Sequence, residues 1–254
     1  MIKHPKISVI TPAYNCSETI QETYQSLLIQ TYEDWEWCVV DDGSDDATAT
    51  ILQEFAKHDA RVRLASVSEN GGAAVARNKA IEMAEGRFLA FLDSDDIWYP
   101  QKLSTQLNTM LTTGAGLSYG SYDVGDKYGT LIGQVVPPAT VDYAHLLRGN
   151  VFGCLTVMLD REVYGTQLMP LIRRRQDFAF WLNLLKQQGP AVTYPGVHAR
   201  YRRHDKSLSS NKLKSVMATW DVYCFQNDLN WAQKIGFFLF GMLTAIKKRI
   251  TVSI

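Results

Sequence analysis

The amino-acid sequence predicts an α/β protein built on a mostly parallel central sheet flanked by helices. Short, β-branched apolar runs alternate with segments of helical periodicity over the first hundred residues. Strands separated by helices of about a dozen residues imply right-handed crossovers between parallel strands. The chain has 254 residues, of which 46% are hydrophobic and 20% are charged, a composition that excludes disordered, collagenous and low-complexity proteins.

Four strands and three helices are expected in this first part. The strands are residues 6–11, 35–40, 61–65 and 87–92, and the helices are residues 17–30, 47–57 and 73–84. The first helix carries Ile20, Tyr24 and Leu27 at helical spacing, which predicts one apolar face. Either Ser44 or Asp45 is expected to cap the second helix, because short polar side chains accept hydrogen bonds from the first helical turn.

Polar clusters follow three of the strands, at residues 11–15, 41–44 and 93–96. Ligands of parallel sheets bind beyond the carboxyl ends of the strands, so these clusters are expected to meet at one edge. The first turn has no glycine-rich phosphate loop, which argues against a nicotinamide dehydrogenase or a P-loop NTPase. A carboxylate pair such as Asp93 and Asp95 can instead hold Mg²⁺ or Mn²⁺, and the metal can bridge a diphosphate.

Charge is distributed unevenly along the chain. Residues 1–100 contain 17 acidic and 8 basic side chains, whereas the remainder contains 9 acidic and 18 basic ones. An acidic half suits a cation and a basic half suits phosphate or an anionic surface, although both can be ordinary solvated surface.

The four cysteines form no CxxC pair and have no histidine at zinc-site spacing, so we expect neither a disulfide framework nor a zinc site. The first 25 residues contain no signal-peptide pattern. These features favour a cytoplasmic protein, and no nucleic-acid partner is expected.

Four motifs occur in order, namely SVITPAYN at residues 8–15, VDDGSDD at 40–46, NGG leading to ARN at 70–78, and FLDSDD at 91–96. Together they resemble family 2 glycosyltransferases, over a stretch from about residue 6 to residue 210. The resemblance implies the GT-A fold with its Rossmann-like sheet, a nucleotide-diphosphate sugar donor, a divalent metal and inversion at the anomeric carbon.

The resemblance also assigns the donor contacts. Tyr14 would pack on the nucleobase and Asp42 would accept a hydrogen bond from it, with Asp41 as its neighbour in the motif. A carboxylate accepts well from an imide N–H, which fits uracil or thymine better than a purine. Further nucleotide or phosphate contacts are expected from Thr11, Pro12, Arg77, Asn78 and Ser94. The alternatives are a turn with a helix cap for the DDGSDD run and an exposed helix arginine for Arg77.

The family's DxD motif matches Asp93, which would contact the ribose, and Asp95, which would bind Mn²⁺ or Mg²⁺. A solvated acidic turn is the alternative, but like charges clustered without a cation are unfavourable. Residues 201–209 resemble the family's YRxHxxSxS stretch, which closes over the diphosphate. Arg202 and His204 would contact phosphate there, and His204 would also reach the metal, whereas a plain basic loop is the alternative.

Residues 115–170 resemble the family's variable acceptor region. Strands are expected at residues 117–123, 130–136 and 155–159, and a short helix is expected at 142–148. Asp177 opens a further helix and looks like the acid of the family's ED motif, which serves as catalytic base. Gln176 replaces the usual first acid of that motif. A helix cap or a partner of the helix dipole is the alternative role for Asp177.

The last part of the chain contains twelve almost unbroken apolar residues at 235–246, preceded by Trp231 and followed by Lys247-Lys248-Arg249. This run is too short to span a bilayer, for which about 20 residues are needed. It is long enough to lie in the interface of an anionic leaflet. Burial as a docked terminal helix or in a homodimer interface is the alternative.

We therefore divide the chain into a donor half (1–113), an acceptor and catalytic-base half (114–212) and a C-terminal helical extension (213–254). The expected activity is metal-dependent, inverting transfer of a sugar from a nucleotide diphosphate, UDP, to a hydroxyl of an acceptor glycan. Surface polysaccharide synthesis on a lipid carrier, at the inner face of a bacterial membrane, is the expected setting. The alternatives are a nucleotidyltransferase, for which a basic signature loop is missing, and an inactive nucleotide-sugar-binding or scaffolding subunit.

Overall fold

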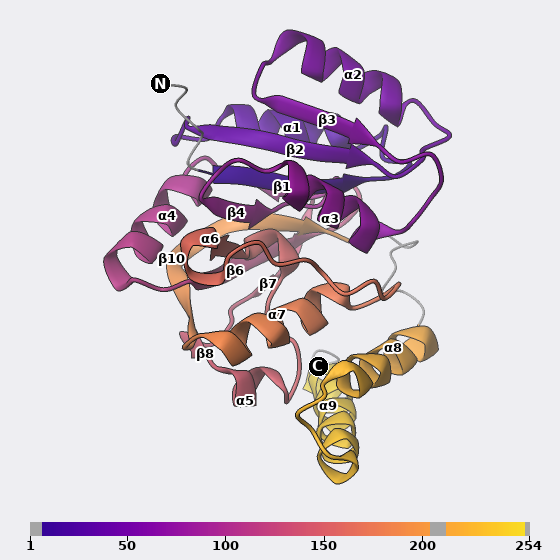
Figure 1. The fold of residues 1–254 in the computed structure, drawn as a ribbon, viewed down its shortest axis with the longest axis vertical. Coiled ribbons are helices and arrows are strands. Elements are labelled where there is room, and N and C mark those ends of the chain that lie inside the picture. Colours follow the sequence, from indigo (N-terminus) through magenta and orange to yellow (C-terminus); the bar gives the residue numbers. More distant parts are fainter. Residues whose placement is uncertain (1–6, 204–211, 252–254) are drawn as a thin grey trace.

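Ten strands form one mixed sheet within residues 7–203 and 212–251, which the computed structural model describes, with side chains for 7–203 and 216–242 (Figure 1). The main strand order is β3-β2-β1-β4-β9-β6-β10-β5, with β7 added to β6 and β8 added to β10. The sheet therefore continues from the predicted donor half into the predicted acceptor half.

The first four strands are parallel, as the sequence predicts. They are β1 (Ile7–Ala13), β2 (Trp35–Asp41), β3 (Val62–Ser66) and β4 (Phe88–Phe91). The crossover helices are α1 (Ile20–Leu28), α2 (Thr48–His58) and α3 (Ala73–Met83). Because β1 lies between β2 and β4, the polar clusters that follow these three strands lie at the same edge.

The second half makes the sheet mixed. Its strands are β5 (Ile97–Trp98), β6 (Leu117–Gly125), β7 (Leu131–Val135), β8 (Thr140–Val141), β9 (Met158–Asp160) and β10 (Ala191–Arg202). Strand β9 runs antiparallel to both β4 and β6 and joins the two halves. The strand expected at 155–159 is partly wrong, because Cys154–Thr156 forms a 3₁₀ turn, in which Thr156 donates to the Gly153 carbonyl.

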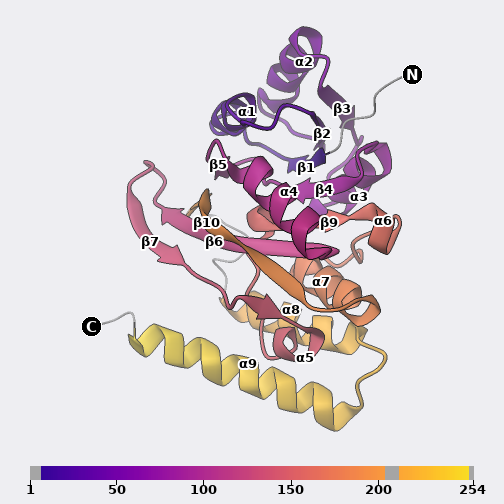
Figure 2. The same ribbon diagram turned by 90° about the vertical axis from the view of Figure 1, so that its left-hand side faces the viewer.

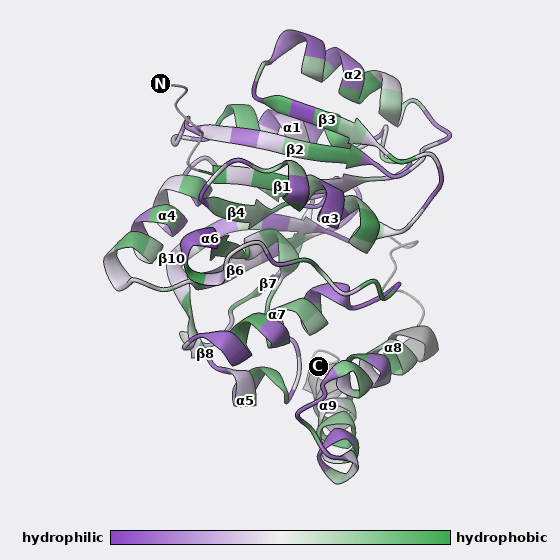
Figure 3. Ribbon diagram, viewed as in Figure 1, coloured by the Kyte–Doolittle hydropathy of each residue, from purple (hydrophilic) through white to green (hydrophobic). Residues whose placement is uncertain are grey.

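Helices cover both faces of the sheet (Figure 2). The helices of the second half are α4 (Lys102–Thr113), α5 (Tyr143–Leu146), α6 (Arg161–Tyr164), α7 (Gln176–Gln187), α8 (Lys212–Phe225) and α9 (Trp231–Thr251). Buried side chains of α1, α2 and α4 pack on one face, and those of α3 and α7 pack on the other. Figure 3 shows the central strands mostly in the hydrophobic colour, as expected for a sheet covered on both sides.

Helix α7 is fixed by aromatic packing at its first turns. Phe178, Phe180 and Trp181 are buried, and the Phe91 ring of β4 lies edge-on to Trp181 with 5.1 Å between centroids. Burying each such side chain stabilises the fold by roughly 1.5–3 kcal/mol. The packing holds the first turn of α7, and with it Asp177, in a fixed place beside the sheet.

Helices α8 and α9 form a hairpin beyond α7 (Figure 2). The Tyr223 hydroxyl donates to the Leu147 carbonyl at 2.7 Å, and Trp220 packs against Phe238 with 5.3 Å between ring centroids. Phe237 and Phe238 are half-buried against the core. One face of α9 is therefore docked, which agrees with one of the alternatives predicted for this segment.

The opposite face of α9 is apolar and exposed. The large apolar side chains exposed on α9 are Trp231, Ile235, Leu239, Phe240 and Met242. None of the helices in the described part of the chain is long and apolar enough to cross a membrane.

Candidate functional site

The loop after β1 and the loop after β2 are tied together. The Asn15 N–H donates to Ser44 Oγ at 3.0 Å, and Asn15 Oδ1 accepts from the Asp45 N–H at 3.0 Å. Asn15 adopts a φ of +46°, a region that asparagine tolerates better than most residues. This arrangement fixes the neighbouring Tyr14, whose ring is 48% exposed at the edge of the sheet.

The expected helix cap from Ser44 or Asp45 is wrong. Helix α2 begins after Ala47 without a side-chain cap, because Ser44 Oγ donates instead to the Asp41 carboxylate. Asp46 contacts the first turn, accepting from the Thr48 N–H at 2.9 Å. Partial burial opposes ionisation of Asp46, but hydrogen bonds from Thr48 and from Ser17 lower its pKa to about 2.

Asp41 and Asp42 contact different neighbours although they are adjacent. The Asp42 carboxylate is buried and accepts from the N–H groups of Gly71, at 3.0 Å, and Gly72, at 2.8 Å. Gly72 has a φ of +90°, which favours glycine. The hydrogen bonds to Asp42 and the glycine at position 72 together fix the turn before α3. Asp42 therefore holds the loop that leads to α3.

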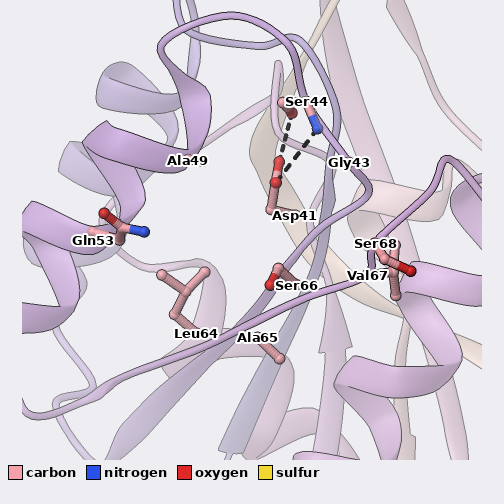
Figure 4. Close-up of a pocket in the computed structure, with 10 residues that line it drawn as sticks. All are labelled: Asp41, Gly43, Ser44, Ala49, Gln53, Leu64, Ala65, Ser66, Val67 and Ser68. Carbon is pink, nitrogen blue, oxygen red and sulfur yellow. Dashed lines mark hydrogen bonds between the residues drawn. The ribbon is translucent and has the colours of Figure 1, made fainter.

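Asp41 instead borders a cavity of about 490 Å³ between the carboxyl ends of β2 and β3 (Figure 4). Leu64 gives the cavity an apolar wall, and Ser66, Ser68 and Gln53 add polar groups. Figure 4 shows the Asp41 carboxylate held by Ser44, the residue that also binds the loop of Tyr14. The cavity and the exposed ring of Tyr14 thus belong to one region of the edge.

The acidic cluster after β4 is crowded. Asp93 is half-buried and ion-paired with Arg77, Asp95 is half-buried, and Asp96 is buried and accepts from the Arg202 N–H at 3.0 Å. Burial raises the pKa of Asp96 well above its usual range, and the neighbouring carboxylates of Asp95 and Asp93 raise it further. The Ser94 carbonyl accepts from Thr19 at 2.9 Å, which fixes the turn.

These carboxylates fit a hard divalent cation. Asp93 and Asp95 offer the oxygen donors that Mg²⁺ and Mn²⁺ prefer, and a cation would relieve their mutual repulsion. No group of three or more potential metal-binding side chains occurs among the residues whose positions are described. Such a metal would take its other ligands from water and from phosphates of a substrate, as is usual for Mg²⁺. His204, the second predicted ligand, lies outside the described residues.

Arg77 lies between the donor cluster and α7. Its side chain is only 6% exposed, so the alternative of an exposed helix arginine is wrong. It is ion-paired with Asp93, and its Nε has no hydrogen-bond partner within the described part of the chain. Burial alone would lower the pKa of Arg77, but the carboxylates of Asp93 and Asp177 hold it above its usual range.

Asp177 reaches the same place from α7. Burial raises its pKa above the usual value, and the guanidinium groups of Arg77 and Arg175 oppose this shift. The Asn150 amide lies 3.4 Å from Asp177 Oδ2. A carboxylate with a raised pKa is suited to accept a proton near neutral pH. The structure thus brings Asp93, Arg77 and Asp177 together, although they come from β4, α3 and α7.

Four other predicted residues lie within β1, α3 and β10, and three of them have partners inside the fold. The Thr11 hydroxyl is buried and accepts from the Trp37 indole at 2.8 Å, so the structure does not bring it to the surface of the site. Pro12 is half-buried within β1. Asn78 makes two hydrogen bonds with the Met169 backbone, at 2.7 and 2.9 Å, and anchors the segment before α7. Arg202 is buried and ion-paired with Glu22.

The sequence pattern assigns no functional role to Cys154. The structure places its thiol in the electrostatic field of Asp93, Arg77 and Asp177, with its pKa raised by burial and by the carboxylates. Asn150 was also missed as a neighbour of the base. The only signal for either residue is the irregular stretch 150–154 before an apolar segment, which indicates no contact by itself.

Comparison with known proteins agrees with this geometry. The model of the family "Glycosyl transferase family 2" matches residues 8–159. The chain is 42% identical over 247 residues to the putative teichuronic acid biosynthesis glycosyltransferase TuaG of Bacillus subtilis, covering 97% of this chain and 98% of the relative. It is 39% identical over 217 residues to the Escherichia coli UDP-Glc:alpha-D-GlcNAc-diphosphoundecaprenol beta-1,3-glucosyltransferase WfgD, covering 85% and 84%.

Solved structures show the same fold. The S. aureus TarS structure in complex with UDP-GlcNAc superposes with a TM-score of 0.72 at 20% identity, covering 92% of this chain and 70% of that one. The mannosyltransferase PcManGT from Pyrobaculum calidifontis, in complex with GDP-Man and Mn²⁺, gives a TM-score of 0.65 at 17% identity, covering 94% and 69%. The motifs, the GT-A fold and these matches lead to one conclusion: the chain is a glycosyltransferase of family 2.

Proposed function

We propose that the enzyme transfers a sugar from a UDP-sugar to a hydroxyl of a lipid-linked acceptor glycan, with a divalent metal and with inversion at the anomeric carbon. The observation that carries this proposal is the meeting of Asp93 and Asp177 around Arg77. Asp93 belongs to the donor cluster and Asp177 is the candidate base. A transferase needs both groups within reach of one reacting carbon.

The donor base is assigned to the region of Tyr14 and the cavity. The exposed Tyr14 ring offers a stacking surface, and a carboxylate at the cavity wall can accept the imide N–H of uracil. Asp41 lies beside the cavity, which supports Asp41 as the acceptor of the hydrogen bond from the uracil imide. Asp42 instead holds the loop that leads to α3.

The leaving diphosphate is assigned to the acidic cluster and to the end of β10. Asp95, helped by Asp93, would hold Mn²⁺ or Mg²⁺, which neutralises charge on a departing diphosphate. Arg202 and His204 would contribute phosphate contacts. The assignment of Arg202 is supported by the hydrogen bond from its backbone N–H to Asp96, which joins the end of β10 to the acidic cluster.

Asp177 would take the proton of the acceptor hydroxyl as its oxygen bonds to the anomeric carbon and the bond to the diphosphate breaks. Attack on the face opposite the leaving group inverts the configuration and needs no covalent enzyme intermediate. The half-buried position of Asp177, beside cationic Arg77, keeps the carboxylate in place and available as a general base.

The acceptor setting is proposed from the relatives and from α9. WfgD is named for an undecaprenol-linked acceptor. A peripheral position at the anionic inner face of a bacterial membrane, in surface polysaccharide assembly, fits the exposed apolar face of α9 and the sequence Lys247-Lys248-Arg249. A homodimer through the same face is the competing explanation.

A panel of nucleotide sugars, screened for hydrolysis without acceptor, tests the donor part of this proposal. We expect hydrolysis of a UDP-sugar with Mn²⁺ and its loss with EDTA. Asp95→Ala should abolish metal-dependent donor binding and Asp93→Ala should weaken it, whereas the matched control Asp221→Ala, exposed on α8, should not. Unchanged donor affinity in EDTA would overturn the metal assignment.

A further inference from the structure

Three consecutive arginines, Arg173 to Arg175, precede the candidate base. Arg173 and Arg175 are exposed, and no ion pair joins either of them to another residue in the described parts of the chain. Arginines elsewhere, such as Arg61 and Arg87, are ion-paired with aspartates. Exposed arginines that have no carboxylate partner and lie beside a reaction site indicate an anionic ligand more strongly than arginines that are already ion-paired.

The patch formed by Arg173 and Arg175 lies on the acceptor side of the site. Arg175 immediately precedes α7 and acts electrostatically on Asp177 and on Tyr223 of α8. Figure 1 shows the start of α7 at the same side of the molecule as the hairpin of α8 and α9. Arg175 therefore lies near both the base and α8, one of the two helices that we place near the membrane.

We propose that Arg173 and Arg175 bind the diphosphate of an acceptor whose sugar is linked to a lipid through that diphosphate. This inference rests on the proposed function. The donor diphosphate is assigned to Asp95 and Arg202, so the patch would be a second, separate anion site.

The spacing suits one acceptor. The Cα atoms of Arg175 and Asp177 lie at most about 7 Å apart, so one bound acceptor can contact both side chains. Asp177 would thus receive the hydroxyl while Arg175 meets the phosphate. Guanidinium groups bind phosphate oxygens through paired, charge-assisted hydrogen bonds, which makes arginine better suited to this task than lysine.

Steady-state kinetics with two acceptors test the proposal. One acceptor carries the sugar on a diphosphate with a short lipid chain, and the other carries the same sugar on an uncharged alkyl group. Arg173→Gln and Arg175→Asn should each raise KM for the diphosphate acceptor roughly tenfold, since hydrogen bonds to charged groups carry that much affinity. Asparagine is chosen at position 175 because its φ of +56° lies in the left-handed region.

Several controls separate this proposal from others. KM for the uncharged acceptor and donor hydrolysis should stay unchanged in both variants, and kcat should stay unchanged in Arg173→Gln. Arg175→Asn removes a cation that lowers the pKa of Asp177, so its kcat is compared at a pH where Asp177 is ionised in both proteins. Lys57→Gln, exposed on α2, should change none of these values. If the wild-type enzyme hydrolyses no UDP-sugar, the proposed function itself is contradicted. With hydrolysis intact, equal effects on both acceptors, or none, would overturn the diphosphate site. Weaker binding to phosphatidylglycerol vesicles with unchanged KM would also overturn it, since the arginines would then serve the lipid surface.

Discussion

Arg77 couples the two sides of the site through charge. It is ion-paired with Asp93 and opposes the rise in the pKa of Asp177 that burial causes. A buried guanidinium that faces two carboxylates stabilises both in their ionised forms. The ion pair and the candidate base therefore belong to one electrostatic unit.

The pKa of Asp177 predicts the acid limb of the pH profile. Burial raises this pKa, and only the ionised carboxylate can accept a proton, so kcat should fall as pH decreases through the raised value. Asp177→Asn should lower kcat by roughly 10²–10⁴-fold and leave donor binding intact. Measured kcat and donor Kd for both proteins check this, and a variant with wild-type turnover would place the base elsewhere.

The folded state should not be weakened by that substitution. Since burial raises the folded pKa of Asp177, ionisation opposes folding, and this penalty grows as pH rises above the unfolded value. Asp177→Asn removes the charge, so its Tm at pH 7 should equal or exceed that of the wild type. Thermal unfolding at pH 7 and at acid pH measures this. A clear loss of Tm at pH 7 would show that the carboxylate is needed for the fold.

Asp41 and Asp42 should respond differently to substitution. Asp42→Ala removes two hydrogen bonds from backbone N–H groups to a buried carboxylate and should cost about 2–4 kcal/mol of unfolding free energy. Asp41→Asn keeps the shape of its side chain and should chiefly weaken donor binding. Denaturant unfolding and donor titration of both variants distinguish these roles, and an equal loss of stability would contradict them.

At the scale of elements, the turn before α3 depends on backbone conformation. Gly72 has a φ of +90°, and an added Cβ would meet no atom within 4 Å. Gly72→Ala should therefore destabilise through backbone strain alone, by roughly 1–3 kcal/mol. A Cβ added at Gly133 on β7 would also meet open space, but Gly133 has no positive φ. Gly133→Ala should therefore change the free energy of unfolding by about 0.5 kcal/mol or less. Equal stabilities of the two variants would disprove this explanation.

Elements with clear periodicity were predictable, and others were not. The first four strands and three helices follow the sequence pattern because their apolar residues face a sheet covered on both sides. Helix α4 was missed because polar Lys102 and Gln106 are buried on its inner face, and Gln106 is satisfied by Ser118 and Thr156. Strand β10 was missed because Pro195 and Gly196 interrupt its pattern where the register shifts.

The sequence predicted the location of the site better than the role of each residue in it. Residue types and order located the edge, yet they could not tell a side chain that binds a ligand from one that holds a loop. Thr11 and Asn78 match the family motifs, but their polar groups bond to Trp37 and to the Met169 backbone. Only the three-dimensional partners of a side chain distinguish these two uses.

For the whole molecule, the exposed face of α9 predicts vesicle binding. Ile235→Gln with Leu239→Gln removes two exposed apolar side chains, 46% and 51% accessible, and should reduce binding to anionic vesicles while Tm stays unchanged. Leu111→Gln on α4, at 47% exposure, is the matched control. Binding should also weaken with salt, because a surface potential is screened within about 10 Å at 0.1 M.

Co-sedimentation and analytical ultracentrifugation distinguish the two uses of this face. If the wild type does not bind vesicles and the double variant separates a dimer, the face joins two copies and the membrane assignment fails.

The configuration of the product tests the central claim most directly. With a UDP-sugar, Mn²⁺ and the diphosphate-linked acceptor, the anomeric proton coupling of the new linkage can be read by NMR. Attack assisted by Asp177 from the face opposite the diphosphate predicts the configuration opposite to that of the donor. Retention of the donor configuration would contradict the single displacement and the role of Asp177 as its base.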